Sequence, residues 1–418
     1  MADRLYARAA LSAGLVGIVA ILWLGPGARS AWHPTDFDRE LQRLDAEVSA
    51  LRSPGLETPD RVTRLAFRLY HRATLTARSE DFLPVQALVD RALSGWPAPD
   101  LLLLRATIDL RFHRLEDARH SVNAIEDAAN DDSAQLLLAD IALQDRGSAE
   151  ARRRIDAVLD RRPTWDARSR LAWLLARQGD VDGADQQYAA AEAELTAKEM
   201  PAFAWVELQR GQMYFARGQY ERAAGHYQRA RRAFSGYWLT DEYEAELLGA
   251  RRDFDRAVAR YQDAISRAPR PDLFHQLGDL YLAMGRPIEA GTWHERALAG
   301  YLASVDNGEV QFFHHLATFY SDVRQDGAAA VRWAKQDWLL RPNDATEDTL
   351  AWALYRNGQF AEALDRSSRA LAGDSVDGHL LFHAMTINQK AGRSAEVRGL
   401  RARLEAFNPS YGDFHVHR

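Results

Sequence analysis

Small residues recur along the chain at a nearly fixed spacing, and each is followed twelve positions later by an alanine. The first set is Ala106, Ala139, Ala172, Gly211, Ala245, Gly278, Ala317 and Ala351. The second set is Ala118, Ala151, Ala184, Ala223, Ala257, Ala290, Ala329 and Ala363. The steps between units are 33 or 34 residues, apart from two of 39. Self-similarity at this period predicts an array of stacked supersecondary units.

Apolar residues around each pair predict two amphipathic helices joined by a tight turn. In the unit Asp272–Leu302, they recur at spacings of three and four on both sides of Gly285. The small residues indicate that the paired helices approach closely, and larger ones such as Leu277 and Tyr281 fill the space between layers. Prolines that can stop a helix follow several second helices: Pro163, Pro269 and Pro342.

This pattern resembles the tetratricopeptide repeat (TPR) family, whose motif runs Leu-Gly or Leu-Ala, Tyr, Gly, Ala, Tyr, Ala and a final Pro. The best matches are Leu277-Gly278, Tyr281, Gly285, Ala290 and Ala297, and Leu350-Ala351, Leu354, Gly358, Ala363 and Ala370. Degenerate units at 64–97 and 377–409 extend the array to about ten repeats. The resemblance implies an all-α, TPR-type helix-turn-helix solenoid over residues 61–410, wound as a right-handed superhelix. In such an array each repeat contacts its neighbours.

The stretch from Ala87 to Thr107 also resembles a group of exported bacterial TPR proteins of unassigned function. The N-terminus fits export, because Arg4 and Arg8 precede an uncharged apolar run, Ala9–Gly25, and small residues follow it. Residues 1–30 are therefore predicted to be either a cleaved signal peptide or a retained membrane anchor. Both alternatives place the repeats in the periplasm, soluble after cleavage or tethered to the inner membrane, and the membrane is contacted only through this segment.

Other segments depart from the regular repeat. Residues 31–60 are predicted to be a linker, and within it Phe37–Leu51 has the apolar spacing of one amphipathic helix that caps the array or spaces it from the membrane. Residues 411–418 are predicted to be a C-terminal tail. The two 39-residue steps each insert about five residues, and we expect the second helices there to run long, through Ala189–Lys198 and Leu298–Ser304.

Composition and motifs exclude several function classes. The net charge of −6 and the lack of a basic, aromatic stripe argue against nucleic acid as a partner. The chain has no cysteine, so it has no lipoprotein anchor, disulfide or thiolate metal site. His294-Glu295 begins like a zinc-protease motif, but Leu298 stands where the second histidine is required. The repeats leave no room for a separate catalytic domain, and we predict no enzyme activity and no cofactor.

The TPR resemblance also implies a binding surface. In that family, residues at the second, fifth, ninth and twelfth places of each first helix line the concave groove that holds a partner. In the second half of this chain the predicted groove residues are Glu242, Glu246, Asp272, His275, Asp279, Gln311, His314, Thr318, Asp348, Trp352 and Tyr355, with His379 at the edge. Carboxylates and flat rings suit a partner protein or peptide with basic residues and apolar anchors. We therefore predict a non-catalytic protein-interaction scaffold of the bacterial envelope.

The histidines leave an alternative open. They crowd the second half of the chain, and His379 and His383 have the spacing that places two ligands on one helical face. Ordinary helix-surface histidines also occur at this spacing. The alternative function is a periplasmic metal- or small-ligand-binding protein that uses the Asp and His lining of the same groove, with His275 and His314 as ligands.

Overall fold

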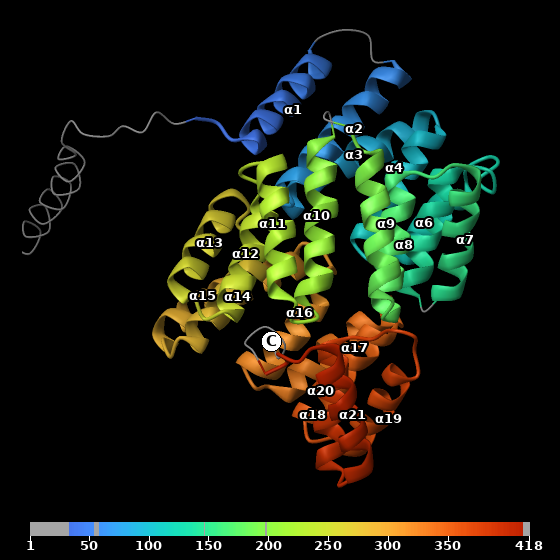
Figure 1. Ribbon diagram of the computed structural model, residues 1–418. Helices are drawn as coiled ribbons and strands as arrows, with labels where there is room; N and C mark the ends of the chain where they lie inside the picture. The colour runs from blue at the N-terminus through green and yellow to red at the C-terminus, as the bar shows by residue number, and fades with distance from the viewer. Residues whose placement is uncertain (1–32, 54–57, 146, 197–198, 413–418) are drawn as a thin grey trace, which may run out of the picture. The chain divides into compact units, whose positions relative to one another are not determined.

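The computed structural model describes residues 33–53, 58–145, 147–196 and 199–412, and these ranges are helical without any β-strand. The first helix, α1 (Asp36–Arg52), is followed by ten pairs of helices in the described residues (Figure 1). The first helices of the pairs are α2 (Pro59–Thr76), α4 (Pro99–Arg111), α6 (Asp132–Gln144), α8 (Trp165–Gln178), α10 (Met200–Phe215), α12 (Trp238–Ala250), α14 (Pro271–Ala283), α16 (Phe313–Thr318), α18 (Asp344–Arg356) and α20 (Gly378–Lys390). The prediction of an all-α array of about ten repeats is confirmed.

The second helix of each pair packs antiparallel to the first after a short turn. These helices are α3 (Ser79–Gly95), α5 (Leu115–Asn123), α7 (Ser148–Arg161), α9 (Val181–Glu194), α11 (Tyr220–Ala233), α13 (Phe254–Arg267), α15 (Pro287–Asp306), α17 (Gly327–Leu340), α19 (Phe360–Leu371) and α21 (Ser394–Phe407). Contacts are densest within a pair and next densest between successive pairs, as the period predicts.

The recurring small residues lie where the paired helices touch. All the alanines of both sets are at most 4% exposed. At Gly211 a side-chain Cβ would overlap the ring of Tyr227, and at Gly278 it would overlap the ring of His294. Because glycine has no Cβ, a large side chain of the second helix can lie directly on the backbone of the first helix at these two places.

In nine of the ten pairs, one described residue of the turn is left-handed. Glycine supplies it in several pairs, with φ of 70° at Gly218 and 73° at Gly285. Other pairs use a residue with a side chain at the corresponding place: His113, Arg252 and Gln325, with φ between 54° and 61°. A missing turn glycine is thus compatible with the same hairpin, at a modest conformational cost.

The two 39-residue steps are accommodated differently. α15 has 20 residues, so the expectation of a long second helix is confirmed there. α9 has only 14 residues and ends at Glu194, so the expected extension to Lys198 is wrong. The first helix of the next repeat, α10, is longer instead, with 16 residues. After α15, α16 continues directly into a π-helical turn, Phe319–Val323 (η2), a rare element that often marks functional sites.

Contacts between distant repeats correct the expectation that each repeat touches only its neighbours. Within the compact unit Asp36–Arg418, hydrogen bonds join residues far apart in sequence. The Trp238 indole donates to the Leu75 carbonyl at 2.9 Å, and the Asn343 amide donates to the Gln144 carbonyl at 3.0 Å. The Val376 amide donates to the Arg177 carbonyl at 2.7 Å. The array therefore folds back on itself, and its inner faces enclose space.

α1 is part of this unit. It packs against α2, and its Phe37 ring lies against Phe234 with centroids 6.3 Å apart. The Asp36 carboxylate accepts hydrogen bonds from the amide and hydroxyl of Ser235, at 3.0 and 2.6 Å. This helix thus covers the first repeat and also joins it to the α11–α12 connection.

The predicted signal or anchor, residues 1–30, lies outside the described residues. In the part of the chain that the structure does describe, no helix has the length and apolar character needed to cross a membrane.

Candidate functional site

A cavity of about 440 Å³ lies among α12, α14, α16, α18 and α20, and we call it the histidine–acid pocket. Its histidines are His275, His314, His315, His379 and His383, and its carboxylates are Glu246, Asp272, Asp279, Asp322, Asp344, Asp348 and Asp377. Arg177 is the one arginine or lysine that lines it among the described residues. Seven acids against one guanidinium make this a site that favours cations.

The pocket arises from the repeat itself. Successive first helices each present two residues one turn apart on the inner face. These pairs are His275 and Asp279 of α14, His314 and Thr318 of α16, Asp348 and Trp352 of α18, and His379 and His383 of α20. Stacking the helices side by side therefore gathers polar side chains from four repeats around one space.

Most of the predicted groove residues meet here. The structure places these around the pocket: Glu246, Asp272, His275, Asp279, His314, Thr318, Asp348, Trp352 and His379. Three others lie elsewhere. Glu242 is buried, 7% exposed, and its carboxylate accepts a hydrogen bond from Gln276. Gln311 donates to the Ser79 hydroxyl at 3.0 Å, and Tyr355 stacks on Trp352.

Two neighbouring glutamates on α12 have strongly shifted acidity. Burial, followed by the charge of Asp272, raises the pKa of Glu242 to about 8. Burial raises the pKa of Glu246 to about 7, against the hydrogen bond that its carboxylate accepts from Gln212 at 3.0 Å. Asp272 differs, because Arg270 contacts its carboxylate and, despite burial, keeps its pKa low. Glu246 lines the pocket, so the α12 side of the pocket is less negative at neutral pH than the sequence suggests.

The predicted aromatic anchor, Trp352, is held by its neighbours. Its ring stacks on His383 at 4.3 Å and on Tyr355 at 5.1 Å, and its indole NH donates to Asp322 at 3.1 Å. His383 in turn lies 2.8 Å from an Asp348 oxygen. Burial would lower the pKa of His383, but the charge and hydrogen bond of Asp348 raise it above the usual value. These contacts hold the indole in one orientation, which suits a surface that presents a preformed shape.

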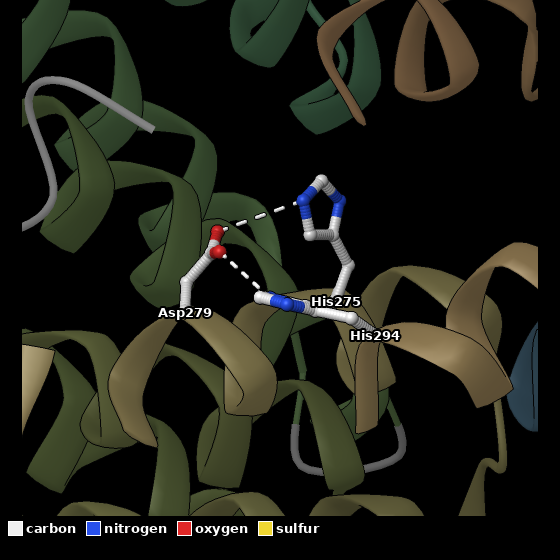
Figure 2. Close-up of side chains that lie close together, drawn as sticks. All are labelled: His275, Asp279 and His294. Atoms are coloured by element: carbon white, nitrogen blue, oxygen red, sulfur yellow. Dashed lines mark hydrogen bonds and ion pairs between the residues drawn. The ribbon is translucent and has the colours of Figure 1, made fainter. Parts of the chain in front are cut away.

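Three side chains converge at the α14–α15 end of the pocket, as Figure 2 shows. One oxygen of Asp279 lies 3.0 Å from Nε2 of His294, and its other oxygen lies 3.6 Å from Nε2 of His275. The ligand-type atoms of the three residues all lie within 4.8 Å of one another. His275 and Asp279 belong to α14 and His294 to α15. His314, the second ligand expected from sequence, is not among them, because its Nδ1 lies 3.0 Å from the Thr349 hydroxyl.

His294 is not among the groove residues predicted from sequence, because it lies on a second helix and not at one of the first-helix groove places. The signal that identifies it is its place in the repeat, four residues after the second-helix alanine. The corresponding residues of the other repeats include the fully buried tyrosines Tyr188, Tyr227 and Tyr261. Tyr227 donates its hydroxyl to Gln212, which occupies the place that Asp279 has in α14. At this place of the repeat, whose side chain contacts the first helix, His294 thus has an imidazole where the three preceding repeats have a phenol.

A second cavity was not predicted at all. It measures about 1050 Å³, lies among the first helices of the earlier repeats, and we call it the aromatic cavity. Its rings are Tyr70, Trp165, Trp173, Trp205 and Tyr237. Trp173 and Trp205 are 37% and 36% exposed, which is unusual for residues this large. Four of the rings lie on α2, α8 and α10, and Tyr237 directly precedes α12, so no single repeat shows the pattern.

The two cavities border each other. Arg177 and Ala345 line both of them. An inner surface with an aromatic part and an acidic, histidine-rich part therefore runs past these two residues.

A second set of three possible ligands, Glu192, Glu207 and His226, lies between α9, α10 and α11. Arginines neutralise it. Arg229 contacts Glu207, and Arg210 lies 3.1 Å from Glu192. Guanidinium groups already occupy the space that a cation would take.

The helix pairs, their period and the buried small residues at the contacts within eight of the pairs decide the architecture. The fold of the described residues is a TPR-type helix-turn-helix solenoid. A family model described as the TT21 fifth ARM repeats domain matches residues 132–237 of this repeat array. No curated protein matches the chain in sequence.

Solved structures of other helical-repeat proteins are similar to this TPR-type chain at low identity. Human IFIT1, in a dimer with PPP-AAAA, is 13% identical over 87% of this chain and 94% of that chain, with a TM-score of 0.46. A chain of the Cut9 and Hcn1 hetero-tetramer of APC/C is 14% identical over 90% of this chain and 80% of that chain, with a TM-score of 0.43. A tetratricopeptide repeat protein from Parabacteroides merdae is 14% identical over 58% of this chain and 93% of that chain, with a TM-score of 0.36.

Proposed function

We propose that this chain is a non-catalytic protein-interaction scaffold of the bacterial envelope. Its ligand is an extended segment of a partner protein that carries a basic residue close to an apolar one. The basic side chain enters the histidine–acid pocket, and the apolar side chain enters the aromatic cavity. The observation that carries this proposal is the junction at Arg177 and Ala345, where an acidic pocket and an aromatic cavity meet.

The acidic side of this surface has unused hydrogen-bonding capacity. Among the described residues, Oδ1 of the buried Asp348 and Nδ1 of His315 have no hydrogen-bond partner, and both residues line the pocket. Buried polar atoms are nearly always satisfied in folded proteins, so such atoms indicate a site for a ligand or an ordered water. A carboxylate prefers a cationic donor such as Lys or Arg.

The aromatic side supplies contact area. Indole rings that are one third exposed are typical of residues that become fully covered in a complex, where tryptophan is enriched among the residues that dominate binding energy. Trp173 and Trp205 fit this description, since both line the cavity and both are partly exposed. Trp352, by contrast, is only partly exposed and already stacks on Tyr355 and His383.

The location in the envelope is part of the proposal and depends on the N-terminal segment. The basic flank and apolar run of residues 1–30 favour export of the repeats to the periplasm, with the segment cleaved or retained as an inner-membrane tether. A C-terminal fusion to a reporter that is active only in the periplasm should give signal, while a reporter that is active only in the cytoplasm should not.

Binding is tested in two steps. A photo-crosslinking residue at Ala345 should capture a partner in cells, while one at Ile288, which is 83% exposed on the second helix α15, should not. A peptide from the captured segment is then titrated calorimetrically. Trp205→Ala should weaken binding by about 1–3 kcal/mol, and Asp348→Asn should weaken it and flatten its salt dependence.

The matched control is Asp365→Asn, which removes an exposed carboxylate on the second helix α19. It should leave affinity unchanged. If Trp205→Ala and Asp348→Asn also leave the affinity unchanged, the partner binds elsewhere and the proposed site is wrong.

A further inference from the structure

We infer that His275, Asp279 and His294 bind a divalent transition-metal ion, with Zn²⁺ as the ion that fits best. The inference is independent of any partner protein. It rests on two imidazole nitrogens that face the two oxygens of one carboxylate, at 3.6 and 3.0 Å, at the edge of a cavity (Figure 2).

The spacing of the ligand atoms suits such an ion. Zinc binds histidine nitrogen and carboxylate oxygen at about 2.0–2.2 Å, which places neighbouring ligands of a tetrahedral site a little over 3 Å apart. The distances from Asp279 to the two imidazoles lie around this value. His275 and Asp279 are one helical turn apart, a spacing that puts two ligands on the same face. Only small side-chain adjustments are needed to bring the three atoms around one ion.

The ligand set also selects the type of metal. Two imidazoles and a carboxylate suit Zn²⁺ and its first-row neighbours, whereas Ca²⁺ and Mg²⁺ prefer all-oxygen sites. Three protein ligands leave a fourth position, as in zinc sites that bind water or a further ligand. That position faces the histidine–acid pocket, because His275 and Asp279 both line it.

A second layer of contacts orients the imidazoles. The hydroxyl of the buried Tyr301 lies 3.4 Å from Nδ1 of His275, so the other ring nitrogen, Nε2, is the one directed at Asp279. Such a partner on the far nitrogen is the usual companion of a metal-binding histidine. Phe319 of the π-helical turn packs its edge on both rings, with centroids 5.0 Å from His275 and 5.8 Å from His294.

The α14–α15 repeat is modified for this arrangement. Where Tyr227 and Tyr261 are buried in the two preceding repeats, this repeat has His294. Gly278 lets the imidazole reach the first helix, because a Cβ there would overlap the ring. The surrounding acids of the pocket add a favourable field for a cation.

The test uses the full chain, freed of metal by chelation and titrated calorimetrically with Zn²⁺ and then Co²⁺. One ion per chain should bind with a dissociation constant of micromolar or below. Co²⁺ should also give the visible absorption of a four-coordinate site. His275→Ala, Asp279→Asn and His294→Tyr should each weaken binding at least 100-fold.

His294→Tyr is the decisive variant, because it restores the residue of the two preceding repeats and should keep the fold. Its helicity and unfolding temperature serve as the check. Glu207→Gln, in the arginine-neutralised cluster, is the matched control and should keep full affinity. The inference is overturned if the unmodified chain releases no heat with either ion, or if the three variants still bind zinc with unchanged affinity.

Discussion

The hairpins α10–α11 and α14–α15 are built alike, yet they treat buried acids in opposite ways. Each contributes to a set of three histidine or carboxylate side chains whose ligand-type atoms lie within 4.8 Å of one another, and the first set takes its third member, Glu192, from the preceding α9. In the first hairpin, Glu207 is 1% exposed and is contacted by both His226 and Arg229. In the second, the oxygens of Asp279 face two imidazoles. The first set is a closed ion network, and the second is one that a cation can complete.

The comparison teaches that convergence of ligand-type residues does not by itself make a metal site. What matters is whether a guanidinium already occupies the centre. Burial would raise the pKa of Glu207, but hydrogen bonds from His226 and Arg229 outweigh it and hold this pKa below its usual value. Glu207 is therefore a charged, satisfied group whose role is structural.

The largest expected effect follows from removing that guanidinium. Arg229→Ala leaves the buried Glu207 charge with only an imidazole partner, and we expect a loss of about 3 kcal/mol in the free energy of unfolding. The corresponding change in the other hairpin, His275→Ala, should cost only about 1 kcal/mol, because Asp279 keeps His294. Urea unfolding followed by circular dichroism measures both.

Arg152→Ala provides the baseline for this measurement. Arg152 pairs with Asp156 one turn along α7, and both side chains are 43% exposed, so the loss should stay below about 0.5 kcal/mol. Equal losses for Arg229→Ala and Arg152→Ala would show that the α10–α11 network contributes no more than a surface ion pair.

The helix α12, between the two hairpins, carries two buried acids, Glu242 and Glu246, whose raised pKa values favour the protonated form. Burial, joined by the charge of Asp272, raises the pKa of Glu242 to about 8, and burial raises that of Glu246 to about 7. Both values lie above the usual carboxyl pKa of the unfolded chain, so the folded state holds more protons over this range. Stability from these groups is therefore complete at low pH and is lost as pH rises through 7 and 8.

The free energy of unfolding should fall by roughly 2–3 kcal/mol between pH 6.5 and pH 9, since each group contributes about 1.4 kcal/mol per pH unit below its folded pKa. Most of this window lies above the pKa of an unfolded histidine, about 6.5. The double variant Glu242→Gln, Glu246→Gln should show a flatter profile, whereas Glu221→Gln, on a side chain 91% exposed, should not. A profile that is equally steep in the double variant would mean that these carboxyls are ionised in the folded state.

The architecture could be predicted because it depends on short-range, repeated features. Paired helices require small residues at their contacts, and this requirement appears in eight repeats in phase, so the period predicts eight hairpins and two degenerate units extend the array to about ten. The extension of α9 could not be predicted. The residues from Ala189 to Lys198 favour helix, but the chain ends α9 at Glu194 and lengthens α10 instead. Local propensity does not decide which of two adjacent helices takes up an insertion.

Part of the pocket follows from the same repeated features, and the rest depends on contacts that the repeat pattern does not contain. The register along each first helix predicts that residues such as Asp279 and Asp348 share one face of the array, and both line the pocket. It could not show that His294 reaches this space from a second helix, because that depends on the absence of a side chain at Gly278. The register also could not show the aromatic cavity. That cavity forms where repeats far apart in sequence come into contact, as the repeats of Leu75 and Trp238 do.

The smallest expected effect concerns His383, whose imidazole lies between the Trp352 ring and the Asp348 carboxylate. Burial opposes its protonation, but Asp348 raises the pKa of His383 above the usual value by its charge and hydrogen bond. Asp348→Asn removes the charge and keeps the shape, so the titration midpoint of the His383 ring protons, followed by NMR, should move to lower pH. Asp377→Asn removes a weaker contributor and should move it less. If the midpoint stays in place in Asp348→Asn, the carboxylate does not control this imidazole. Asp348 would then also be a weaker candidate for pairing with a basic residue of a partner, because its charge would be of little consequence inside the pocket.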